Sequence, residues 1–144
     1  MIYKQGSFGR VFVLKFEDKD DLLGELKKIA VKEKIKAGTI MLLGGLRNAG
    51  IVTGPKEAVI PPDPLWVNVS DGREVVGFGT LFWNDKDPAI HLHGAVGRDH
   101  ETLTGCIRKD SCVYLVVEAI ITEILGIDGK RTLDEKTGLV LLEL

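Results

Sequence analysis

Residues Arg10–Gly38, RVFVLKFEDKDDLLGELKKIAVKEKIKAG, change from one hydrophobic periodicity to another within a single stretch. The part Arg10–Phe16 alternates apolar with other side chains, which is typical of a β-strand. The apolar residues that then recur at helical spacing are Leu22, Leu26, Ile29 and Ala30. Lys and Glu fill the opposite face, Asp18 is the expected N-cap, and Gly38 is the expected stop signal. The stretch therefore predicts one strand followed by one amphipathic helix.

The rest of the chain is dominated by strand signals separated by turn residues. Ile40–Leu43 is predicted as a buried strand that Gly44-Gly45 breaks or bulges, and residues 55–64, with four of the five prolines, are predicted as a surface loop. The β-branched content of Val113–Leu125 favours a strand over a helix. The further predicted strands are LWVNVS (65–70), REVVGFGTLFW (73–83), AIHLHGAV (89–96), ETLTGCIR (101–108), CVYLVVEAIITEIL (112–125) and GLVLLEL (138–144).

This order of elements predicts the fold class. One strand, one main helix and then many antiparallel strands indicate an α+β fold with an antiparallel, barrel-like core. The 144 residues have the size of one domain, so we expect a single domain over residues 1–144. The hydrophobic fraction is 44% and the aromatic fraction only 6%, which predicts an aliphatic core.

Charge and cysteine usage exclude several classes of function. The formal net charge is −2, from 19 basic and 21 acidic residues, which argues against a protein whose main task is to coat nucleic acid. Two cysteines make no disulfide framework, so we expect a reducing, cytoplasmic setting. We expect no signal peptide, because the N-terminal stretch MIYKQGSFGR has no apolar h-region. We expect no membrane segment, because no apolar run approaches the roughly 20 residues that cross a bilayer.

The segment AIHLHGAVG carries His91 and His93, which are two residues apart. Side chains alternate along a strand, so both imidazoles should point to the same side with Cβ atoms about 7 Å apart. The residues that follow have the length of a hairpin, with 97–101 as the turn and 102–107 as the returning strand. Cys106 would then lie opposite the histidine pair, and two imidazoles with one thiolate suit zinc and leave a fourth position open.

Two alternatives stay open at this point. His100 competes with Cys106 as the third ligand, although a residue at the tip of a turn usually faces solvent. A histidine pair can also be an ordinary feature of a strand, and a lone cysteine is often a small buried hydrophobic residue.

Several segments together resemble the plant- and prokaryote-conserved (PPC) domain family, over nearly the whole chain. These are GRVFVLKFEDKDDLLGELKKIAVKEKIKAGTI (9–40), GGLRNAGIVTG (44–54), HLHGAVG (91–97), TGCI (104–107), EAIITEI (118–124) and DEKTGLVLLEL (134–144). The resemblance implies an antiparallel α+β fold assembled as a homotrimer. It also implies similarity in fold to acetolactate decarboxylase, a zinc enzyme.

The resemblance implies the ligand set of the metal site as well. Proteins of both kinds often carry a His-x-His pair followed by a Gly-Gly-His segment that supplies a third histidine. His91 and His93 match the pair, whereas Thr104-Gly105-Cys106 stands in place of Gly-Gly-His. A thiolate at Cys106 would still bind zinc but would lower the Lewis acidity of the ion. By analogy of fold alone, the reaction class would be a lyase or hydrolase acting on a small oxo acid.

Two further residues are candidates for the chemistry. Glu118 is an acid inside an apolar run, where a carboxylate is costly unless it is paired or ligating, so it is the candidate general acid or base. Its alternative is an outward-facing strand residue. Arg47 follows a glycine pair and either binds an anionic ligand in the metal cleft or forms an intersubunit salt bridge.

DNA binding and a purely protein-interacting role are the alternative functions. In plants, proteins of the family carry AT-hooks, which need a Gly-Arg-Pro core, but Gly9-Arg10 precedes Val11 and Gly72-Arg73 precedes Glu74. The lysines of KKIAVKEKIK form a solvated helix face. A trimer could still pool a basic patch from Arg47, Arg108, Lys109 and Arg131.

Overall fold

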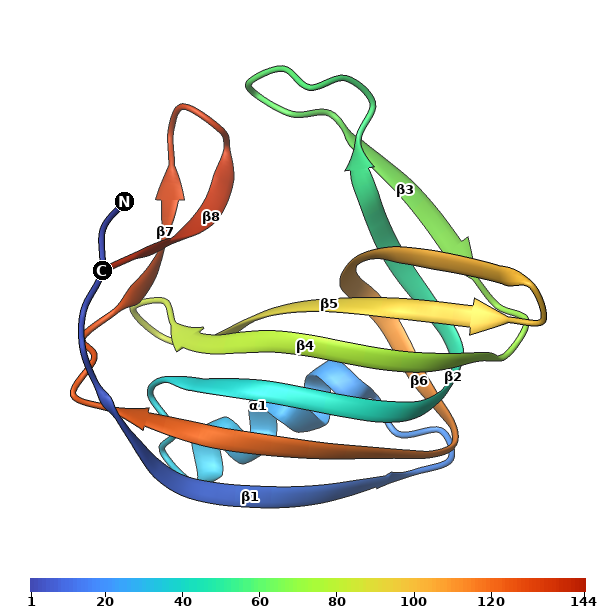
Figure 1. Ribbon diagram of the computed structural model, residues 1–144, viewed down its shortest axis with the longest axis horizontal. Helices are drawn as coiled ribbons and strands as arrows, with labels where there is room; N and C mark the ends of the chain where they lie inside the picture. The colour runs from blue at the N-terminus through green and yellow to red at the C-terminus, as the bar shows by residue number, and fades with distance from the viewer.

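A computed structural model describes residues 1–144 and consists of one short helix and one eight-stranded sheet (Figure 1). The elements, in chain order, are β1 (Ser7–Glu17), α1 (Leu22–Lys32), β2 (Gly38–Pro55), β3 (Pro64–Val69), β4 (Arg73–Trp83), β5 (Pro88–Arg98), β6 (Glu101–Leu125), β7 (Lys130–Asp134) and β8 (Leu139–Glu143). The sheet-dominated α+β class predicted from the sequence is confirmed. The helix is not long enough to cross a membrane.

The sheet curls because two long strands each pair with different partners along their length. The first half of β2 pairs with β4 and with the last part of β6, whereas its second half pairs with β3 and the first part of β6. The pairings of β2 with β4, β4 with β5, β5 with β6 and β6 with β2 make a closed circuit. This circuit is the barrel-like core predicted from the sequence.

The bend in β2 occurs at the predicted glycine pair. Gly44 has a φ of 141°, and the register against β6 shifts between Gly44 and Gly45. A Cβ atom on Gly44 would collide with the carbonyl oxygen of Val116 on the neighbouring strand. Glycine is therefore required here for both conformation and space.

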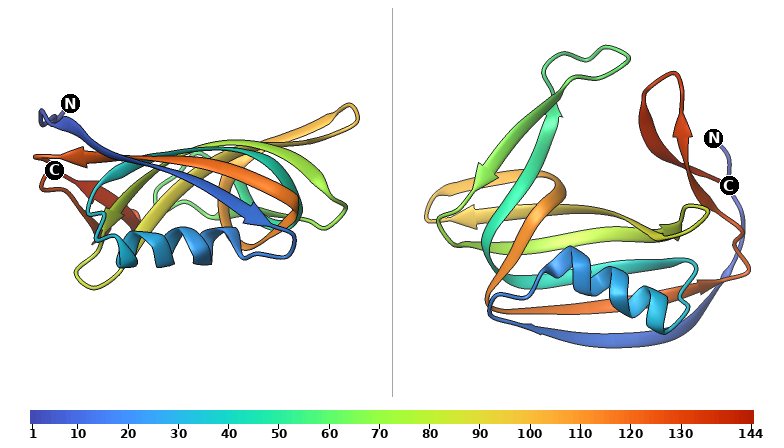
Figure 2. Two further views of the ribbon diagram at one scale, coloured as in Figure 1. Left: turned by 90° about the horizontal axis from the view of Figure 1, so that it is seen from below. Right: turned by 180° about the vertical axis from the view of Figure 1, so that it is seen from behind.

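The helix lies across one face of the sheet (Figure 2) and buries its apolar side. Leu22, Leu26 and Ala30 are buried in the core cluster. Asp18 is not the N-cap: Asp21 holds that position, and the helix ends at Lys32, six residues before Gly38. Asp18 is used elsewhere, because its carboxylate accepts a hydrogen bond from the Leu115 amide.

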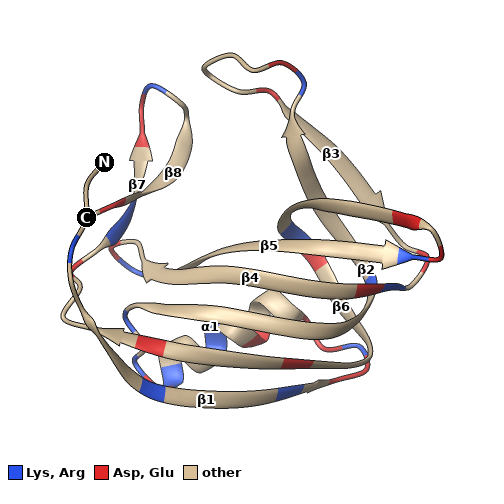
Figure 3. Ribbon diagram, in the orientation of Figure 1, with Lys and Arg blue, Asp and Glu red and all other residues tan.

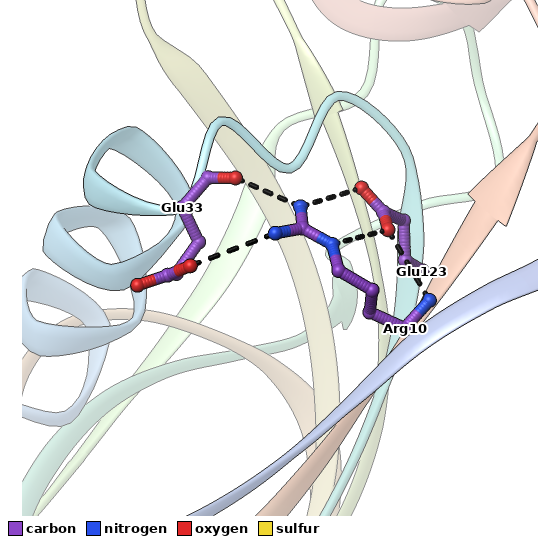
Figure 4. Close-up of polar contacts among 3 residues, drawn as sticks. All are labelled: Arg10, Glu33 and Glu123. Carbon is purple, nitrogen blue, oxygen red and sulfur yellow. Dashed lines mark hydrogen bonds and ion pairs between the residues drawn. The ribbon is translucent and has the colours of Figure 1, made fainter.

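An ion-pair network joins β1, the end of α1 and β6 (Figure 4). The Arg10 guanidinium donates to both carboxylate oxygens of Glu123, at 2.9 and 3.0 Å, and to the backbone oxygen of Glu33 at 2.8 Å. Glu33 is the C-cap, so a cation satisfies a carbonyl at the negative end of the helix. These contacts hold the pKa of Glu123 below its ordinary value, mainly through the hydrogen bond from Arg10.

Two features of the C-terminal half differ from the sequence prediction. Residues 101–108 and 112–125, predicted as two strands, belong to the single strand β6, which passes Asp110 and Leu115 in left-handed conformations. The short strand β7 was not predicted. It forms a hairpin with β8 and touches β4 through Trp83 and Lys130, and one wall of the site described below comes from this hairpin.

Candidate metal centre

The histidine pair lies on β5, whose side chains alternate between the core and the outer face. Leu92 is fully buried in the core cluster, whereas His91 and His93 on either side of it are exposed. Across the sheet, Thr80 on β4 pairs with His91 and Phe78 pairs with His93. Cross-strand partners point to the same side of a sheet, so these four side chains share the face opposite the helix.

The hairpin between β5 and β6 brings Cys106 to the histidines. Arg98 pairs with Glu101, which leaves Asp99 and His100 as a two-residue turn, and Asp99 has the positive φ of 54° that such a turn needs. This register places Cys106 directly opposite His93. A one-residue slip would turn the thiol to the other face, so the turn fixes the composition of the site.

The three side chains converge to the spacing of a metal site. The ligand atoms of His91, His93 and Cys106 all lie within 4.8 Å of one another, and we call this group the triad. The two Nε2 atoms are 3.1 Å apart. Two nitrogens bound tetrahedrally to zinc at 2.0–2.1 Å would be about 3.3 Å apart, so a small adjustment would accommodate the ion. The donor set, two imidazoles and one thiol, suits zinc.

The surroundings set the protonation states of the triad. Partial burial of the His91 ring, assisted by the cations Arg131 and Arg108, lowers the pKa of His91, which favours the neutral imidazole that ligates metals. Burial raises the pKa of the Cys106 thiol, although the guanidinium of Arg108 acts in the opposite direction. The thiol is therefore protonated at neutral pH until a cation displaces its proton.

The structure places the other candidate residues away from the triad. His100 is at the tip of the turn, where its Nε2 lies 3.3 Å from Asp99, and it is almost completely exposed. Arg47 pairs with Asp18 of the same chain at 2.6 Å and stacks near the Tyr114 ring. Neither residue belongs to the group of potential ligands.

Glu118 lies on the same sheet face as the histidines but at a distance. It is exposed on the second half of β6, between Leu43 and Lys15 of the neighbouring strands. Three strand spacings, about 14 Å along the sheet, separate it from β5. Its role as a general acid or base stays a prediction, because its carboxylate is not beside the triad.

Two hollows flank the triad. One, of about 570 Å³, includes His93, Cys106, Arg108 and Trp66 in its lining. The other, of about 490 Å³, includes His91, Arg108 and Arg131, and we call it the His91 hollow. The sequence named Arg108 and Arg131 only as parts of a basic patch, since nothing in their local pattern connects β7 with the histidine strand.

Comparison with known proteins identifies the family and agrees with this fold. Residues 3–125 match the family model of the Plants and Prokaryotes Conserved (PCC) domain, and the chain belongs to this family. The resemblance to the PPC family noted from the sequence is thereby confirmed. Comparison with curated protein sequences gives no significant match.

Solved structures share the fold along the whole chain. A metal-containing protein from Archaeoglobus fulgidus is 23% identical with a TM-score of 0.87, and each chain is covered completely. A PPC protein from Pyrococcus horikoshii is 22% identical with a TM-score of 0.84, over 100% of this chain and 98% of the other. A protein from Ralstonia eutropha JMP134, whose name attributes DNA binding to it provisionally, is 19% identical over 92% and 90% of the two chains, with a TM-score of 0.77. At these identities the likeness establishes the fold alone.

Proposed function

We propose that the chain binds one divalent metal ion, preferentially zinc, through His91, His93 and Cys106, and presents it to a small anionic ligand. The observation that supports this proposal is the convergence of the three ligand atoms within 4.8 Å. The relative from Archaeoglobus fulgidus, described as metal-containing, adds support. With three protein ligands, a bound zinc ion keeps a position at which it can polarise an oxygen atom of the ligand.

The residues around the triad have definable tasks in this function. The strand register holds the two imidazoles and the thiol on one face, and partial burial of the His91 ring lowers its pKa, which favours the neutral imidazole. Cys106 would bind the ion as a thiolate, so the cysteine must be reduced and must lose its proton. Both cysteines are free, and we propose the reducing cytoplasm as the place of action.

Elemental analysis of the purified protein tests this function. We expect zinc near one ion per chain in the wild type, and loss of the ion in His93→Ala and Cys106→Ala. Two matched controls, His100→Ala and Cys112→Ala, remove the same chemical groups outside the triad and should retain the ion. A wild type that takes up no zinc, or controls that lose it equally, would refute the assignment.

We further propose that the chain assembles as a homotrimer through the sheet face opposite the helix. Six large apolar side chains on this face are exposed, and the strand register makes them neighbours. They are Val13, Met41, Leu43, Val76, Phe78 and Ile120. A contiguous exposed apolar patch of this kind is typical of a protein contact. Phe78 pairs across the strands with His93, so the contact surface would extend to the triad.

The assembly can be measured by light scattering. One chain has a mass of 15.8 kDa, so a trimer would have about 47 kDa. Replacing Val13 and Met41 together by Lys should give a monomer, because two unpaired charges would be buried at the contact. The matched control Val59→Lys changes an exposed valine in the proline-rich loop and should leave the mass unchanged. A wild type of 15.8 kDa would refute the trimer.

DNA binding is the second candidate, favoured by the name of the structural relative from Ralstonia eutropha. Basic and acidic residues are interspersed over the fold, without a continuous basic stripe (Figure 3). A mobility-shift assay with an AT-rich duplex tests it. Binding that weakens steeply with salt would support this function, and no shift at low salt would exclude it.

A further inference from the structure

Arg131, on β7, is a buried cation without a counter-ion. The residue is 8% exposed, and its Nη2 atom donates to the hydroxyl of Thr80 at 2.8 Å. Its Nε atom is buried and has no hydrogen-bond partner. No ion pair in the chain includes Arg131, although guanidinium groups that are removed from water are normally paired.

The guanidinium is directed to the metal triad. Thr80, which accepts its hydrogen bond, is the cross-strand partner of His91. Opposite residues of an antiparallel pair have Cβ atoms about 5 Å apart, and Arg131 and His91 line the same hollow, so we infer that the guanidinium and the imidazole are neighbours. The positive charge of Arg131 acts on both His91 and Cys106, which agrees with this position.

Arg108 adds a second cation to the same place. It follows Cys106 by two residues on β6 and lines the His91 hollow together with Arg131. Asp87 and Lys27 also line this hollow, but neither arginine forms an ion pair with Asp87. With a divalent ion in the triad, the positive charge of the ion and the two arginines would exceed the negative charge of the single thiolate, which favours the binding of an external anion.

We propose that Arg131, assisted by Arg108, forms a carboxylate-binding subsite beside the triad, for a small monocarboxylate with a short apolar group such as a 2-oxo acid. The fork of a guanidinium matches a carboxylate, and its Nη1 atom, which neither bonds to the chain nor is among the buried unpaired atoms, is the donor that the ligand would use. Apolar walls of the His91 hollow, formed by Leu23, Ile90 and Leu139, fit the short apolar group, and about 490 Å³ limits its size.

The subsite rests on the proposed metal function and deepens it. Arg131 lies beyond residues 3–125, the part of the chain that matches the family model. The C-terminal hairpin therefore provides the group that selects the ligand, while the matched part provides the metal ligands.

Anion binding to cobalt-substituted protein tests the subsite, because the visible spectrum of the cobalt ion reports both metal uptake and ligand approach. The probes are sodium acetate and sodium 3-methyl-2-oxobutanoate, with acetamide as the neutral comparison. We expect the wild type to bind both carboxylates, the branched oxo acid more tightly, and to ignore acetamide. Arg131→Gln should keep cobalt near one per chain and bind the oxo acid roughly ten- to a hundredfold more weakly.

Two further variants make the outcome specific. Arg131→Lys, which keeps the charge but not the fork, should bind with intermediate strength and serves if the glutamine variant does not fold. Arg98→Gln removes an exposed arginine that is paired with Asp71, and it should behave as the wild type. Equal binding by the wild type and both Arg131 variants, or equal weakening in Arg98→Gln, would overturn the subsite while leaving the metal function intact. A wild type that takes up no cobalt would overturn both.

Discussion

The alternation of side chains on β5 predicts that two adjacent residues control two separate properties. Leu92 is 0% exposed and supports the core beneath the triad, whereas His93 faces outward and is a proposed ligand of the ion. Leu92→Ala should lower the free energy of unfolding by about 3 kcal/mol, which for a chain of this size lowers Tm by roughly 6–12 °C. Free zinc at about a hundred times its Kd should add about 2.7 kcal/mol, which raises Tm by roughly 5–11 °C.

Thermal unfolding at fixed protein concentration, after chelation and again with zinc, measures both properties. Leu92→Ala should have a lower Tm than the wild type. Zinc should still raise this Tm by as much as in the wild type, provided that the β5 backbone is retained. His93→Ala should have the same Tm as the chelated wild type, and zinc should not raise that Tm. The reasoning fails if His93→Ala loses as much stability without metal as Leu92→Ala does, or if zinc leaves the wild-type Tm unchanged.

Three further perturbations test the site and the fold. Because burial raises the pKa of Cys106, zinc binding at pH 7.5 should release about one proton per ion. Calorimetry in two buffers of different ionisation enthalpy measures this release, and no release would argue against thiolate ligation. Arg10 lowers the pKa of Glu123, so the folded state binds fewer protons than the unfolded state on the acid side. The stability that Glu123 contributes is therefore present above about pH 4.3, the ordinary pKa of a glutamate, and is lost as the pH falls further. The difference in Tm between the wild type and Glu123→Gln should therefore be present at pH 7 and shrink on acidification, and a constant difference would contradict this ion pair. Finally, a Cβ atom on Gly105 would collide with the carbonyl oxygen of Val52, so Gly105→Ala should displace the neighbouring Cys106 and lower the zinc content. Gly138→Ala strains the backbone at a φ of 67° in the turn between β7 and β8 but meets no neighbouring atom, so it should leave the zinc content unchanged.

Much of the fold could be predicted because the local patterns are strong. The periodicity of Leu22, Leu26 and Ala30 predicts the helix, and the pair Gly44-Gly45 predicts the bend in β2. The N-cap was misassigned because several acids precede the helix, and only tertiary contacts show that Asp18 pairs with Arg47. The length of β6 was missed because residues 109–111 resemble a turn, yet pairing with β2 on both sides carries the strand through them.

The sequence by itself determined that His91 and His93 share one side of a strand, because alternation is a local property of the extended chain. It also indicated a hairpin that could return Cys106 to them. Only the tertiary structure decided the register that sets Cys106 opposite His93, since that depends on the two-residue turn at Asp99 and His100. It alone also brought Arg131 to Thr80, the cross-strand partner of His91, because a contact between residues 51 positions apart depends on how the C-terminal hairpin packs against β4. Glu118 and Arg47, chosen for their chemistry, lie away from the triad for the same reason: residue type shows what a side chain can do, and packing decides where it lies.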